Sequence, residues 1–185
     1  LHFDKPDIAG VGIGRSFARV LVRLNPKASI GLIPAAFGGT SLDQWKPGGE
    51  LYTNAVTRAR AAMKSGRLRG ILWHQGEADS RSEEAIATYR ERWTKLMETL
   101  RRELNAPDVP IVVGELGEFF TARAPLAPQV NEQLALLPLH FSHTTFVSSA
   151  GLKDKGDSTH FDTPSVREFG RRYAHAFLML DPGWE

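Results

Sequence analysis

Short apolar runs alternate along the chain with longer segments in which apolar residues recur every three or four positions. The apolar runs have the length and composition of buried strands and cover residues 29–36, 68–74, 110–114 and 144–149. The segments with helical spacing cover residues 16–24, 50–65, 82–104 and 126–137, and a last helix is expected from residue 163 onward. This alternation predicts a parallel sheet with helices on both faces.

Local signals set the expected helix ends. Ser80 followed by Glu83 predicts a capping box for the helix at 82–104. Thr163 is expected to cap the last helix, with Pro164 at its first helical position. One stripe at helical spacing is expected to lie in the core: Tyr89, Trp93, Leu96 and Leu100.

Composition narrows the class of protein. The 185 residues fit one domain, with 42% hydrophobic and 24% charged residues and a net charge of +2. Lys and Arg are scattered among Glu residues, which is typical of a solvated surface, so we expect neither nucleic-acid nor membrane binding. The absence of Cys excludes disulfides, thiol catalysis and cysteine-bound zinc. The compartment stays open, because a secreted or periplasmic location would require a signal lost from the N-terminus.

Polar segments follow three of the expected strands. They are Gly38-Gly39-Thr40, the stretch from His74 to Asp79, and the stretch from Gly151 to His160. In parallel sheets, ligands bind at the carboxyl ends of the strands. The sequence therefore predicts a site where these three segments converge.

Each segment offers chemistry beside a plainer interpretation. The N–H groups of the paired glycines could stabilise an oxyanion, or the glycines could form a tight turn. Gln75 offers an amide to the same oxyanion. Glu77 or Asp79 could orient a histidine, or simply lie near a helix N-terminus. Asp157, three residues before His160, suits a pair in which the carboxylate fixes the tautomer of a general base.

Other groupings are weaker. The glycines at 10, 12 and 14 follow no strand, so nucleotide binding is not expected. His140 and His143 are expected to be structural or exposed. The spacing of His74, Glu77, Asp79 and His160 matches no metal-binding motif, and we expect neither a metal nor an organic cofactor.

The three segments together resemble the SGNH hydrolase superfamily, and within it the acetyl xylan esterase and sialate O-acetylesterase-like group, carbohydrate esterase family six. The resemblance covers nearly the whole chain. It rests on Gly38-Gly39-Thr40 with Trp45, on Trp73 to Glu77, and on Asp157 to Phe161, in the family's order. It implies a three-layer α/β/α sandwich with a flavodoxin-like parallel sheet, formed by residues 1–185 as a single domain.

The resemblance also implies roles. Gly39 N–H and the Gln75 side chain would form the oxyanion hole, and His160 would be the base. Asp157 is the first choice for the acid that orients His160, and Glu77 the second. The implied substrate is an acetylated carbohydrate, deacetylated through an acetyl-enzyme without a cofactor. Thr40 and Trp45 are candidate substrate contacts, although Trp45 could equally pack in the core.

The family's nucleophile segment has no counterpart in these residues. Neither Ser16 nor Ser41 stands in a matching context, so the nucleophile is unknown. That segment would also bring a central strand, which we expect to come from a missing N-terminal segment of the same protein, a separate fragment or another copy. Two alternatives follow: a non-catalytic, degenerate esterase domain that binds glycan, and a hydrolase that uses Ser41.

Overall fold

A parallel sheet of three strands forms the centre of the computed structural model, which describes residues 10–184. The strands are β1 (Ile71–Trp73), β2 (Ile111–Gly114) and β3 (Thr144–Val147), with β2 between the other two and parallel to both. The predicted strands at 68–74, 110–114 and 144–149 are confirmed in place, although each is shorter than expected.

Helices connect the strands, as the alternating pattern predicts. The α-helices are α1 (Ile13–Leu24), α2 (Glu50–Met63), α3 (Glu83–Ala87), α4 (Tyr89–Glu103), α5 (Glu118–Thr121), α6 (Ala127–His140) and α7 (Thr163–Leu180). Short 3₁₀ turns complete the described part: η2 (Leu42–Trp45), η3 (Asp79–Arg81) and η4 (Pro182–Trp184). None of these helices is long and apolar enough to cross a membrane.

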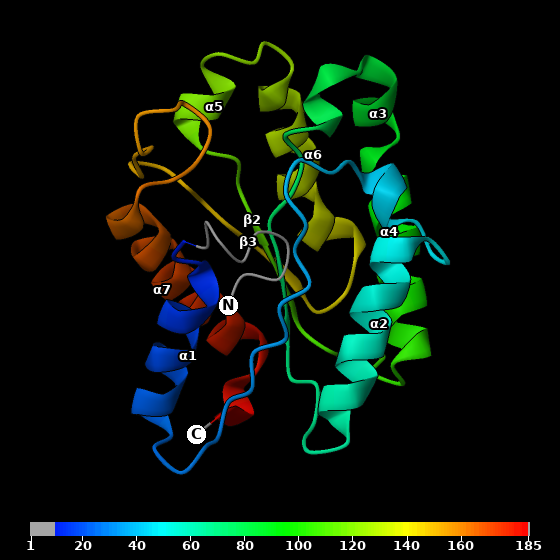
Figure 1. The fold of residues 1–185 in the computed structure, drawn as a ribbon, viewed down its shortest axis with the longest axis vertical. Helices are drawn as coiled ribbons and strands as arrows, with labels where there is room; N and C mark the ends of the chain where they lie inside the picture. The colour runs from blue at the N-terminus through cyan, green and yellow to red at the C-terminus, as the bar shows by residue number, and fades with distance from the viewer. Residues whose placement is uncertain (1–9, 185) are drawn as a thin grey trace.

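The central strand has an apolar core on each of its faces. Ile111 and Val113 pack into a core that includes side chains of α2, α4 and α6. Val112, between them, points the other way and packs with Phe17 of α1 and Phe177 of α7. Alternate side chains of a strand leave opposite faces of its sheet. The helices accordingly fall into two groups, with α1 and α7 together on one side (Figure 1).

The helix expected at 82–104 is interrupted. Thr88 has φ −99° and ψ 0°, outside helical values, and it separates α3 from α4. Its hydroxyl and its backbone N–H both donate to the Glu84 carbonyl, at 2.9 Å and 3.1 Å. The expected stripe nevertheless faces the core, because Tyr89, Trp93 and Leu96 are buried and Leu100 packs against them.

Two predicted helix caps are wrong by one or two residues. Ser82, not Ser80, caps α3 by accepting from Ala85 N–H. Ser80 lies inside η3, where its hydroxyl donates to the Glu77 carbonyl. Asp162, not Thr163, caps α7 by accepting from Ser165 N–H. In both places a neighbouring residue has the extended backbone that an N-cap requires.

The strand predicted at 29–36 does not form, and that prediction is wrong for the structure as described. The segment pairs with no strand among residues 10–184, and Leu32 within it is 51% exposed. It runs as an extended stretch along the molecule between the two groups of helices (Figure 1). A strand needs a neighbour for its backbone groups, and within the described residues β1 pairs only with β2. Segment 29–36 and β1 do not pair with each other.

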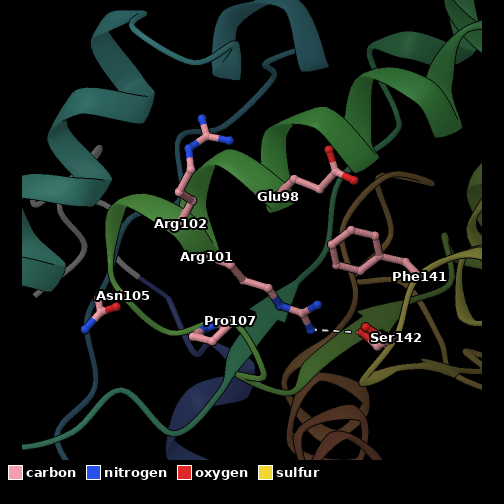
Figure 2. A pocket seen from close by; sticks show the side chains of 7 residues that line it. All are labelled: Glu98, Arg101, Arg102, Asn105, Pro107, Phe141 and Ser142. Atoms are coloured by element: carbon pink, nitrogen blue, oxygen red, sulfur yellow. Dashed lines mark hydrogen bonds between the residues drawn. The ribbon is translucent and has the colours of Figure 1, made fainter.

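Arg101 joins elements at the amino ends of the strands. It projects from α4 beneath Phe141 and toward Ser142, beside a shallow pocket (Figure 2). Its Nη2 donates to the carbonyls of Val109 at 2.7 Å and Ser142 at 3.0 Å, just before β2 and β3. Burial lowers the pKa of this guanidinium, and the carbonyl oxygens and the Phe141 ring stabilise its charge. Arg101 therefore has a structural role: it links α4 to the segments before β2 and β3, at the end of the sheet opposite the polar segments.

Candidate active site

The predicted convergence of three polar segments at one end of the sheet is found. The Gln75 amide, after β1, donates to the Thr40 carbonyl at 2.9 Å and so holds the glycine loop against that strand. Phe161, beside His160, contacts the ring of His74 with centroids 5.8 Å apart. The parallel strands β1 and β3 place their carboxyl ends at the same edge of the sheet. The glycine loop follows no strand in the described residues and is joined to this edge through Gln75.

His160 and Asp157 form a hydrogen-bonded pair. The Nδ1 atom of His160 lies 2.7 Å from Asp157 Oδ2, and the His160 side chain is 68% exposed. Asp157 Oδ1 accepts from the N–H groups of Thr159 at 3.0 Å and His160 at 2.8 Å. The carboxylate is thus fixed by the backbone of its own loop, and Nε2 of the ring makes no hydrogen bond within residues 10–184.

These contacts also set the charge of Asp157. The backbone N–H of His160 holds the pKa of the Asp157 carboxyl well below its usual range, helped by the hydrogen bond from the ring. The N–H of Thr159 acts in the same direction. A carboxylate that accepts several hydrogen bonds is favoured in its charged form. Asp157 therefore stays ionised wherever the protein is folded near neutral pH.

The loop that carries His160 is held from both sides. Lys155 N–H donates to the His160 carbonyl at 2.9 Å, which closes the loop at its base. Arg123, just after α5, donates from Nε to the Ser158 carbonyl at 2.7 Å and from Nη2 to Thr159 Oγ1 at 2.6 Å. Nothing in the local pattern around Arg123 indicated this role, because its partners lie 35 and 36 residues away.

Glu77 lies with a different histidine. Its Oε1 is 3.7 Å from His74 Nε2, and no hydrogen bond or ion pair joins Glu77 to His160 in the described residues. Between the two acids that the sequence left open, Asp157 is the one that contacts the ring of His160. No three His, Asp or Glu side chains within residues 10–184 gather in an arrangement that could hold a metal ion.

Gly39 adopts a backbone conformation that favours glycine, with φ +73°. It is exposed, and its N–H makes no hydrogen bond to another described residue. The next residue is held firmly: Thr40 Oγ1 donates to the Phe37 carbonyl and accepts from Trp45 Nε1, each at 2.9 Å. The loop therefore presents Gly39 N–H without a hydrogen-bond partner among the described residues, beside a Thr40 side chain that is held in place.

The Gln75 side chain is buried and fully engaged. Its Nε2 donates to the Thr40 carbonyl at 2.9 Å and to Asp79 Oδ2 at 2.6 Å, and its Oε1 accepts from Tyr89 Oη at 3.0 Å. An amide nitrogen carries two protons, so both are used inside the protein in this arrangement. Two acceptors around one atom also establish which end of the amide is the nitrogen.

Thr40 and Trp45, the candidate substrate contacts, are buried, at 6% and 8% exposed. The Trp45 ring meets Trp73 edge to face, with centroids 6.1 Å apart. Of the two roles left open for Trp45, the structure shows packing in the core. The hydrogen bond from Trp45 to Thr40 ties the glycine loop to the core.

No hydroxyl among residues 10–184 hydrogen-bonds to His160 Nε2. At the start of η2, Ser41 N–H donates to Gln44 Oε1 at 3.1 Å, and no hydrogen bond joins the Ser41 hydroxyl to His160. Ser16 lies in α1 against Gly170 of α7. The contact that would make Ser41 a nucleophile is therefore not present.

An ionised acid, an accessible imidazole and a free backbone donor at the carboxyl end of a parallel sheet define the class: an α/β protein with a hydrolase-like site. The model of the family "Carbohydrate esterase, sialic acid-specific acetylesterase" matches residues 1–179. The chain belongs to this family of carbohydrate esterases.

Individual relatives agree with that assignment. The chain is 33% identical, over 181 residues, to an Arabidopsis thaliana protein named as a probable carbohydrate esterase, covering 96% of this chain and 67% of that protein. The crystal structure of that same Arabidopsis thaliana protein matches with a TM-score of 0.87 at 31% identity, covering 95% of this chain and 72% of that one.

Two more distant structures share the fold. NanS matches with a TM-score of 0.82 at 20% identity, over 96% of this chain and 76% of its own. A carbohydrate acetylesterase from Xanthomonas citri matches with a TM-score of 0.77 at 19% identity, over 92% of this chain and 41% of its own.

Proposed function

We propose that this chain supplies the base, its acid partner and the oxyanion loop of a serine esterase that removes O-acetyl groups from carbohydrate. The observation that carries the proposal is the 2.7 Å contact between His160 Nδ1 and Asp157 Oδ2. A carboxylate at Nδ1 fixes the tautomer in which Nε2 is free to take a proton. The exposure of the ring leaves Nε2 open to a nucleophile and a substrate.

The nucleophilic serine, in this proposal, comes from a segment other than the described residues, in the same polypeptide, a separate fragment or another copy. That segment brings a strand between residues 29–36 and β1. Two observations on residues 10–184 support it: segment 29–36 is extended and pairs with no strand, and β1 pairs on one side only. With the strand in place, the molecule is a three-layer α/β/α sandwich of the SGNH type with a flavodoxin-like sheet.

The reaction then has two steps. His160 Nε2 takes the proton of the serine hydroxyl as its oxygen attacks the acetyl carbonyl, and the protonated ring then gives that proton to the departing sugar oxygen. The sugar leaves with its hydroxyl restored, and the acetyl group is bound to the serine. Water, deprotonated by the same nitrogen, attacks the acetyl-enzyme, and the serine oxygen recovers the proton as acetate leaves.

The oxyanion of both steps is stabilised by Gly39 N–H, which has no partner in the described structure. Gln75 is the second donor. The bond that it exchanges for the oxyanion is the one to the Thr40 carbonyl, because its bond to the charged Asp79 is shorter and stronger. Loss of one such donor typically lowers kcat by about 10² to 10³-fold.

The substrate class is tested by acetate release from acetyl xylan, O-acetylated sialic acid and p-nitrophenyl acetate with the complete protein. We expect release from at least one acetylated carbohydrate, with no added metal. Carbohydrate binding without acetate release would favour the degenerate, glycan-binding alternative. That alternative has one observation in its favour, namely that no described hydroxyl meets His160.

A further inference from the structure

Asp79 is a fully buried carboxylate that bonds to Gln75 and to Leu42 N–H, three residues after Gly39. Its side chain has no exposed surface, although it lies in the short turn η3 at the edge of the site. A buried carboxylate is costly unless it is paired and hydrogen-bonded. Each of its hydrogen-bond donors comes from a different part of the fold, which makes this residue a junction.

The Oδ2 atom of Asp79 joins the two halves of the oxyanion site. It accepts from Gln75 Nε2 at 2.6 Å, on the side of β1, and from Leu42 N–H at 3.0 Å, at the end of the glycine loop. Gln75 in turn holds the Thr40 carbonyl. The glycine loop is thus tied to the end of β1 through one carboxylate oxygen and one amide.

The Oδ1 atom of Asp79 fixes the junction to α4. Arg92 Nη2 donates to it at 2.9 Å, and the same guanidinium is held by Thr88 Oγ1 and the Ala85 carbonyl. Arg92 also pairs with Asp43 at 3.0 Å, but the Asp43 side chain is 75% exposed. The two carboxylates share one cation and differ in burial, so one is a natural control for the other.

We infer that Asp79 is a positioning residue for the oxyanion donors: it orients the Gln75 amide and fixes the glycine loop that presents Gly39 N–H. This inference rests on the proposed function. Asp79 also leaves Gln75 one proton for exchange, because it holds the other by a charge-assisted bond. Since the donors matter most when the oxyanion forms, the role belongs to the transition state and to kcat rather than to substrate binding.

The test is the kinetics of Asp79→Asn in the complete protein with p-nitrophenyl acetate. Asn cannot supply acceptors to Gln75, Leu42 and Arg92 at once, so we expect kcat to fall about 10-fold to 100-fold with KM changed less than about 3-fold. Asp43→Asn removes the other partner of Arg92 and should leave kcat unchanged. Normal kcat for Asp79→Asn, or an equal loss for Asp43→Asn, would overturn the inference.

A double-mutant cycle separates positioning from general support of the fold. If Asp79 acts through Gln75, the double variant Asp79→Asn with Gln75→Ala should lose kcat by a smaller factor than the product of the two single losses. Full additivity would show that Asp79 acts independently of Gln75. If Asp79→Asn does not fold, Asp79→Glu keeps the charge but moves the carboxylate by one methylene, and it must also lower kcat; an unchanged kcat would sink the inference.

Different results would contradict the proposed function and the inference about Asp79. An unmodified protein with no acetylesterase activity overturns the proposed function and this inference with it. An active protein in which the Asp79 variants keep normal kcat leaves the function standing and overturns the inference alone.

Discussion

The ring of His160 has two nitrogens in different situations. Nδ1 is bound to Asp157, whose other oxygen is held by two backbone N–H groups of the same loop. Nε2 makes no hydrogen bond within the described residues. The Asp–His spacing of three residues is sufficient for this arrangement, because the loop brings the Asp157 carboxylate within hydrogen-bond distance of Nδ1. At this scale the sequence is informative, since all the partners are local.

The first prediction concerns the stability of this loop as pH changes. The folded pKa of Asp157 lies below its ordinary value of 3.8, so its contribution is present above that value and is lost as pH falls through the folded pKa. We expect the difference in unfolding free energy between the unmodified protein and Asp157→Asn to hold near pH 5 and to shrink below about pH 4. Urea unfolding at pH 2 to 5 measures it. A difference that grows toward pH 2 would contradict the assignment.

For the candidate oxyanion residues, the sequence does not predict the long-range contacts that hold them in place. The pattern singled out Gly39 and Gln75 as candidates, which stays a prediction, but it did not indicate Asp79 as their support, because Asp79 bonds to Leu42 and Arg92 across 37 and 13 residues. The pattern also left open whether Trp45 contacts the substrate or packs in the core. Only the packing against Trp73 decides that question.

At the scale of elements, three of the four expected strands form at the expected places, and helices form within each segment of helical spacing. The strand at 29–36 fails because a strand depends on its neighbour, which no local pattern supplies. The helix at 82–104 is broken at Thr88, whose φ of −99° and ψ of 0° lie outside helical values. Neither outcome could be predicted from hydrophobic periodicity alone.

The loop from 153 to 162 depends on an element remote in sequence. Arg123 after α5 is its clamp, so we expect Arg123→Ala to lower kcat by about 3-fold to 30-fold, an order-of-magnitude expectation for a displaced base. Arg123→Lys should restore activity only in part, because one ammonium cannot reproduce two divergent bonds. Steady-state kinetics with thermal unfolding as the control measures this. Unchanged kcat in Arg123→Ala would show that the loop holds itself.

At the scale of the whole molecule, two apolar cores enclose a sheet whose β1 edge pairs with nothing among residues 10–184. Exposed strand edges invite pairing with another strand. The alternation of apolar runs and helical segments predicts the parallel sheet. The alternation cannot predict that segment 29–36 does not pair with β1 in the described residues, because pairing depends on which strand lies beside it.

Hydrogen exchange tests whether a strand occupies that edge. Ile71 N–H donates to the Pro110 carbonyl, and alternate residues of a strand direct their backbone groups to opposite sides, so Leu72 N–H faces the open edge. In the complete protein we expect Leu72 N–H to be protected comparably to Val112 N–H. Exchange of Leu72 at the rate of an exposed amide would contradict the proposal that a strand fills the edge.

The most direct measurement of the central claim is acetate release by the complete protein and by its His160→Ala variant, on the acetylated carbohydrate that the unmodified protein cleaves best. The claim predicts turnover by the unmodified protein and a loss of at least about 10³-fold in the variant, with circular dichroism and unfolding temperature unchanged. Near-normal acetate release by a folded His160→Ala variant would contradict the account.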